Sequence, residues 1–135
     1  MSLPIYIAGG SSEIELCDKL TDAVERAGGR ITFAWTQVGP WSLGRPLTMT
    51  ERAELAQRDL AAVAEARLFW LVLPQRLSEG AHVELGAALT LRAMGRPLEI
   101  VVSGPMLDSR LFPARADQIF ERHEEALAYV VGRCG

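Results

Sequence analysis

One glutamate stands in an almost uncharged helical segment. Glu84 is the only Asp, Glu, Lys or Arg residue between Ala81 and Leu91. A carboxylate near the start of an apolar helix costs free energy unless it has a polar partner or a chemical role. The apolar residues 68–73 precede this helix and are typical of a buried strand. Open α/β sheets bind ligands at the carboxyl ends of such strands, so Glu84 is the first candidate for a catalytic residue.

Asp59 is the second candidate carboxylate. It falls at the helical phase of Ala56 and Val63, inside an apolar stripe, although a solvated surface position is the common alternative for such an aspartate. Buried carboxylates often have perturbed pKa values and mark working sites. Two carboxylates in one cleft suit chemistry at the anomeric carbon of a sugar. One attacks or stabilises an oxocarbenium-like centre while another group assists the leaving base.

Two short turns combine glycine and serine directly before a helix. They contain Gly9, Gly10, Ser11 and Ser12 after the first expected strand, and Ser78 and Gly80 after the third. Glycine lets the backbone approach a ligand closely, and free N–H groups at a helix start attract anions. The spacing matches neither a P-loop nor a dinucleotide fingerprint. Capped tight turns and a phosphate or sugar site therefore both remain open, and in a doubly wound fold we expect the two turns to converge.

Two tryptophans and one histidine have weaker claims. Trp35 ends the second expected strand, and Trp41 lies in the loop that follows. Either ring could stack on a base, with aromatic contacts adding about 1 kcal/mol beyond burial. The alternative is that Trp35 belongs to the core and Trp41 anchors its loop. His82 is expected on a helix face, and no ligand cluster indicates a metal, so we expect no metal or organic cofactor.

Strands and helices alternate along the chain. Strands are expected at residues 5–8, 30–35, 68–73 and 98–102, with a further short strand near 119–120, and helices at about 12–27, 48–64, 81–91 and 121–132. Such alternation indicates right-handed crossovers and a parallel sheet with helices on both faces. We predict one three-layer, doubly wound α/β domain over residues 1–135. Its flavodoxin-like strand order would be 2-1-3-4, with the fifth strand as an option.

Local signals set the expected helix ends. Ser12 with Glu15, and Thr48 with Glu51, have the spacing of capping boxes. Gly28 provides a C-terminal stop for the first helix.

Composition narrows the function classes. The 135 residues carry a net charge of −3, which provides no basic footprint for nucleic acid, and 49% are hydrophobic, which supports a packed core. The two cysteines fit neither a disulfide scaffold nor a metal site. No secretory signal pattern and no apolar run of roughly 20 residues is visible. We expect a cytoplasmic protein that neither spans a membrane nor binds nucleic acid.

These motifs resemble the nucleoside 2-deoxyribosyltransferase superfamily. That group includes the deoxynucleoside 5'-monophosphate N-glycosidases and the CMP hydrolases. The resemblance extends from the first expected strand to residue 97, about two-thirds of the chain. Its strongest part is the pattern Ser78-x-Gly80-x-x-x-Glu84-x-Gly86-x-Ala88.

The resemblance implies roles for four residues. The glutamate that Glu84 matches is the nucleophile at C1', and the aspartate that Asp59 matches assists the base or orients the sugar. The tyrosine that Tyr6 matches lies near the sugar and the catalytic carboxylate. The transferases have an aspartate where this chain has Ser78, whereas the monophosphate hydrolases have serine. A hydroxyl at a helix N-terminus favours a phosphate that a carboxylate would repel.

The chain also departs from that pattern. Some monophosphate hydrolases have an arginine where this chain has Ser12, so another basic residue, such as Arg45 or Arg110, would have to bind the phosphate. Dimers in the family complete the site with a loop of the neighbouring subunit, and Ser109 lies about where such a contact is expected. The resemblance therefore implies a homodimer or higher homo-oligomer.

The leading interpretation is an N-glycosidase that hydrolyses the base–sugar bond of a nucleoside 5'-monophosphate, ordinary or modified. Glu84, Asp59 and Tyr6 would form its catalytic group. The substrate would contact both glycine–serine turns, Trp35 and Ser109. A deoxyribosyltransferase that exchanges bases is the nearest alternative, and a non-catalytic nucleotide-binding or sensor module is the other.

Overall fold

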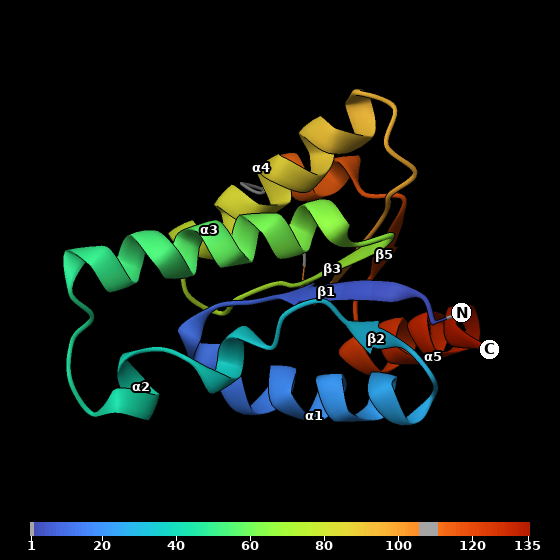
Figure 1. The fold of residues 1–135 in the computed structure, drawn as a ribbon. Helices are drawn as coiled ribbons and strands as arrows, with labels where there is room; N and C mark the ends of the chain where they lie inside the picture. The colour runs from blue at the N-terminus through green and yellow to red at the C-terminus, as the bar shows by residue number, and fades with distance from the viewer. Residues whose placement is uncertain (1, 106–110) are drawn as a thin grey trace.

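The sheet of this protein is entirely parallel. The computed structural model describes residues 2–105 and 111–135. Its five strands are ordered β2-β1-β3-β4-β5 (Figure 1). They are β1 (Pro4–Ala8), β2 (Arg30–Ile31), β3 (Leu68–Val72), β4 (Glu99–Ser103) and β5 (Gln118–Phe120). The predicted α/β architecture and strand order are confirmed, including the fifth strand.

Helices cover both faces of the sheet. α1 (Ile14–Arg26) and α5 (His123–Cys134) pack on one face, while α3 (Met49–Glu65) and α4 (Glu79–Ala93) pack on the other (Figure 1). All five residues of β3 are buried because both of its faces are covered. No helix among the described residues has both the length and the apolar character needed to cross a bilayer.

Side chains alternate between the two cores along each strand. In β1, Ile5 and Ile7 face α1 and α5, whereas Tyr6 and Ala8 face α3 and α4. This alternation places the phenol of Tyr6 on the face that also carries Glu84. The carboxyl ends of β1 and β3 lie side by side because these strands pair directly.

One predicted capping box is correct and the other is wrong. Thr48 Oγ1 accepts from Glu51 N at 3.1 Å, and Thr48 N donates to the Glu51 carboxylate at 2.9 Å. Ser12 does not cap a helix, because α1 begins only at Ile14, after a 3-10 turn η1 (Ser11–Glu13). The Ser12 hydroxyl instead donates to Glu13 Oε2 at 2.6 Å, so a neighbouring buried carboxylate takes the hydrogen bond.

The second strand is shorter than predicted. β2 ends at Ile31, and residues 35–37 form a 3-10 turn η2 (Trp35–Gln37). Trp35 Nε1 donates to the carbonyl of Ile7 at 2.7 Å, which holds the indole against β1 and turns the chain out of the sheet. The expected loop that follows contains a short helix, α2 (Pro40–Leu43). The predicted stop of α1 is confirmed, because Gly28 adopts φ 100° after Arg26.

Candidate active site

Two carboxyl groups meet between α3 and α4. Glu84 on α4 is only 8% exposed, and Asp59 on α3 is half-buried. Their side chains are close enough to share a hydrogen bond. Asp59 Oδ1 is buried, and no donor group among the described residues reaches it. A hydrogen bond between the two carboxyls therefore requires a proton that one of them holds.

Tyr6 adds a donor to this pair. Its hydroxyl donates to Glu84 Oε2 at 2.7 Å, and the Tyr6 side chain is completely buried. The ring stacks against Phe69 of β3 with centroids 6.0 Å apart, which fixes its position within the core. Burial raises the pKa of Tyr6 far above its ordinary value, so the hydroxyl keeps its proton and remains a donor. Tyr6 thus orients one oxygen of Glu84 and stabilises its charged form.

Burial shifts the protonation of both carboxyls. It raises the pKa of Glu84 to about 8, opposed by the Tyr6 hydrogen bond and reinforced by the charge of Asp59. Burial also raises the pKa of Asp59 to about 6, opposed by the interaction with Glu84 and the charge of Arg58. The two groups titrate as a pair that holds one proton near neutral pH. Such a pair offers one ionised oxygen for attack and one acid for proton donation.

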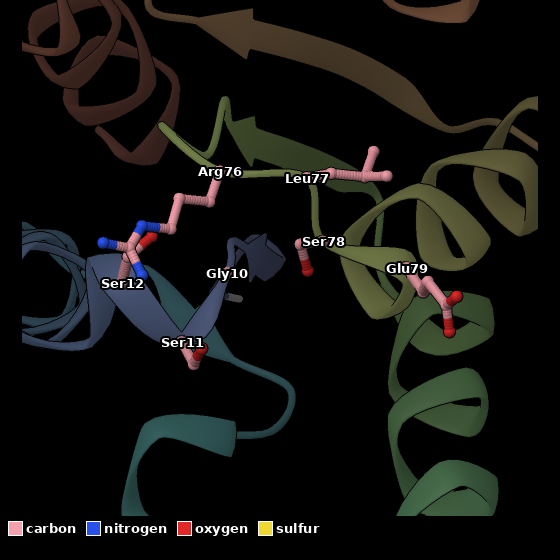
Figure 2. Close-up of a pocket in the computed structure, with 7 residues that line it drawn as sticks. All are labelled: Gly10, Ser11, Ser12, Arg76, Leu77, Ser78 and Glu79. Atoms are coloured by element: carbon pink, nitrogen blue, oxygen red, sulfur yellow. The ribbon is translucent and has the colours of Figure 1, made fainter.

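A hollow of about 490 Å³ lies where the two glycine–serine turns meet. It is lined by Gly10, Ser11, Ser12, Arg76, Leu77, Ser78 and Glu79 (Figure 2). A Cβ at Gly10 would lie 3.1 Å from the Cβ of Pro74 and 3.2 Å from that of Ser78. Glycine is therefore needed for this close approach of the first turn to the second. The turns converge as the topology predicts.

The hollow and the Tyr6–Glu84 hydrogen bond share two elements, β1 and α4. Tyr6, Asp59 and Glu84 do not line the hollow. Glu84 lies six residues after Ser78, the N-cap of α4, which is roughly 9 Å along a helix axis. Tyr6 lies in β1, four residues before Gly10, which belongs to the turn after that strand. β1 and α4 therefore connect the two places.

Ser78 and Gly9 have structural contacts in the two turns, whereas Gly80 lies beside open space. Ser78 Oγ accepts from Ala81 N at 3.2 Å, so it caps α4 and still has its own proton to donate. Gly9 lies beside Trp35, where an added Cβ would be 3.6 Å from the indole and 2.7 Å from Cys17 Sγ. Gly80 has open space around its α-carbon and does not line the hollow.

Trp35 and Trp41 hold the loop after β2. Trp35 Nε1 donates to Ile7, and Trp41 Nε1 donates to the carbonyl of Thr36 at 2.9 Å. The two rings meet edge-on with centroids 6.3 Å apart. These contacts support the interpretation of Trp41 as a loop anchor. Stacking of a base on Trp35 stays a prediction.

Arg76 was missed by the sequence analysis. Its exposed side chain reaches toward Ser12 at the hollow (Figure 2) and makes no ion pair or side-chain hydrogen bond within the described part of the chain. Its position two residues before Ser78 was the available signal. Arg45, considered instead, is held by Glu51 through two hydrogen bonds of 2.8 and 2.9 Å.

Two further predictions concern Ser109 with Arg110, and metal binding. Ser109 and Arg110 lie outside the described residues. Within residues 2–105 and 111–135, no group of three or more His, Cys, Asp or Glu side chains is arranged to hold a metal ion.

Comparisons with known proteins give a match in structure but not in sequence. No family model matches this chain, and no curated protein matches it. A solved structure, the CMP N-glycosidase BcmB of Clostridium botulinum, matches with a TM-score of 0.57 and 17% sequence identity. The match covers 94% of this chain and 97% of that one. At this identity the likeness shows a shared fold, and it agrees with the architecture that the motif resemblance implied.

Proposed function

We propose that this protein is an N-glycosidase that hydrolyses the base–sugar bond of a nucleoside 5'-monophosphate. The observation that carries the proposal is the buried pair of Glu84 and Asp59, with Tyr6 donating to Glu84. The fold shared with a protein named as a CMP N-glycosidase supports the same reaction class. Retaining glycosidases use this kind of arrangement at an anomeric carbon, a carboxylate nucleophile beside a second acid.

Glu84 has the higher pKa of the two carboxyls, so in the first proposed step the proton of the pair moves to Asp59. The ionised oxygen of Glu84 then attacks C1' from the face opposite the base. The C1'–N bond breaks, and its electron pair leaves with the base. Asp59, which shares the proton of the pair, donates it to the departing base or fixes the sugar hydroxyls. The product of this step is an ester between C1' and the Glu84 carboxylate.

Water completes the reaction in the second step. The Asp59 carboxylate accepts a proton from a water molecule, whose oxygen attacks C1'. The ester bond breaks and returns its electron pair to Glu84, which releases the sugar phosphate and restores the starting proton balance. The Tyr6 hydroxyl donates to Glu84 before the attack on C1' and again as the ester breaks. It therefore stabilises the carboxylate as a leaving group.

The hollow beside Gly10 suits the 5' end of the substrate. Ser11, Ser78 and the N-terminus of α4 supply donors, and the helix dipole favours an anion there. Arg76 supplies the positive charge that the glycine–serine turns lack. The carboxylate of Glu79 also lines the hollow, which makes Arg76 the more important for a phosphate.

Base release from a panel of substrates tests this function. Purified protein is incubated with nucleoside 5'-monophosphates and the matching nucleosides, with and without an added free base, and products are separated by chromatography. We expect base release from at least one monophosphate, faster than from its nucleoside, and almost none with Glu84→Gln.

Other outcomes identify the alternatives. Efficient exchange of the added base into nucleoside would indicate a transferase instead. Nucleotide binding without base release, unchanged by Glu84→Gln, would indicate a binding or sensor module.

A further inference from the structure

A buried carboxylate joins the two turns that line the hollow. Glu13 is 6% exposed and lies directly after Ser12. Its Oε2 accepts from Ser12 Oγ at 2.6 Å and from the backbone N of Gln75 at 3.1 Å. Ser12 belongs to the turn after β1 and Gln75 to the turn after β3, 62 residues further along the chain from Glu13. One side-chain oxygen therefore bridges the two turns.

The other oxygen of Glu13 packs under Gly10. Glu13 Oε1 would lie 3.0 Å from a Cβ at Gly10. This oxygen is buried and has no donor among the described residues. Gly10 itself lines the hollow, so the carboxylate lies immediately behind the hollow's wall.

Packing alone does not explain a carboxylate in this place. Within the described chain Glu13 has no ion pair, and a buried charge with only two hydrogen bonds is costly. Its charge also acts on His123 of α5, whose ring bonds Ser103. Such a cost is typical of groups that keep a site in shape.

We propose that Glu13 is a positioning residue that sets the separation of the two turns and so shapes the hollow for the substrate's phosphate. This inference rests on the proposed function. Glu13 does not touch the substrate; it acts through Ser12 and through the backbone at Gln75, next to Arg76. The acceptor oxygen performs this role, whereas the negative charge opposes phosphate binding.

Two variants of matched side-chain length separate the effect of the Glu13 hydrogen-bond acceptor from the effect of its negative charge. Glu13→Gln keeps an oxygen acceptor and removes the charge. Glu13→Met removes both and fills the same space. Glu15→Ala, two residues away and exposed, is the control.

Steady-state kinetics on a monophosphate and its nucleoside give the first readout. With Glu13→Met we expect KM for the monophosphate to rise about tenfold, the effect of losing one such hydrogen bond, with kcat and the nucleoside KM little changed. Glu13→Gln should keep the KM of the unmodified protein or lower it. Equal effects of the Met and Gln variants, or an equal rise for monophosphate and nucleoside, would overturn the proposal.

Two readouts need no catalysis. Hydrogen exchange at the Gln75 amide should accelerate in Glu13→Met and stay protected in Glu13→Gln. Calorimetric titration with inorganic phosphate should show weaker binding only for the Met variant.

If base release is absent from every substrate, the proposed function fails, while hydrogen exchange and phosphate titration still decide the role of Glu13. A Met variant that unfolds while the Gln variant folds would show a general structural role and count against the proposal.

Discussion

The hydroxyl of Tyr6 lies 2.7 Å from Glu84 Oε2 and joins β1 to α4 across 78 residues of sequence. Tyr6 is fully buried, and Glu84 is nearly so. The bond therefore lies where the dielectric is low and where hydrogen bonds strongly affect protonation. It links the central sheet to the residue on which the proposed reaction depends.

Tyr6→Phe should impair activity by changing the protonation of Glu84. Without the donor, the pKa of Glu84 rises further, because the Tyr6 bond lowers it in the native protein. We expect the acidic limb of the pH–rate profile to move to higher pH and activity at neutral pH to fall about tenfold, with about 1 kcal/mol of stability lost. Tyr129→Phe, which removes a bond to Glu99, is the matched control and should leave the profile in place. An unmoved acidic limb in Tyr6→Phe would contradict the assignment.

The carboxyl pair should make the free energy of unfolding depend on pH. The folded protein raises the pKa of Asp59 from 3.8 to about 6 and that of Glu84 from 4.5 to about 8. At a pH between the ordinary and the folded pKa of each group, the native state binds more protons than the unfolded chain. Stability therefore falls as pH rises from about 4 to about 8. Urea unfolding across this range should show the decline in the unmodified protein. The decline should be smaller in Asp59→Asn with Glu84→Gln, and an equal slope in both proteins would refute the pairing.

Arg76→Ala should weaken recognition of the phosphate. Arg76 is the only cationic residue among the described residues that line the hollow. We expect KM for a monophosphate to rise about tenfold while KM for the nucleoside stays the same. Added salt should reduce the difference between variant and unmodified protein, because the interaction is exposed. Arg26→Ala removes an exposed cation paired with Asp22 in α1 and should change neither constant. An equal rise in KM for the monophosphate and the nucleoside would show that Arg76 does not act on the phosphate.

Gly10→Ala should destabilise the junction of the two turns. Its Cβ would meet Glu13, Pro74 and Ser78 at 3.0 to 3.2 Å, and two of these contacts are carbon atoms near the backbone. We expect a loss of about 1–3 kcal/mol in the free energy of unfolding. Gly86→Ala, in α4 with open space around it, should instead gain roughly 0.5–1 kcal/mol. Chemical denaturation of both variants measures the contrast, and a neutral Gly10→Ala would show that the turns can separate freely.

Local patterns were sufficient for the architecture. The alternation of apolar strands and helices predicted the parallel sheet, and the Thr48–Glu51 capping box is a short-range feature that the sequence displays directly. The meeting of Glu84 and Asp59 was also predictable. Each stands out in an apolar stripe, and doubly wound topology packs their helices together.

Long-range contacts explain what the sequence did not reveal. Ser12 has the spacing of an N-cap, but its hydroxyl is bound by Glu13, whose carboxylate also binds Gln75 from a distant turn. The second strand was overestimated because the bond from Trp35 to Ile7 ends it early. No local pattern contains these partners.

The nucleophile assignment is tested most directly by mass spectrometry of a quenched reaction. The protein is mixed with a reactive nucleoside 5'-monophosphate, stopped in acid and digested, and the peptides are sequenced. We expect a peptide whose mass is increased by the sugar phosphate, with the modification on Glu84, and no such peptide from Glu84→Gln. A sugar adduct on a different residue, or base release that continues at the normal rate in Glu84→Gln, would contradict the assignment.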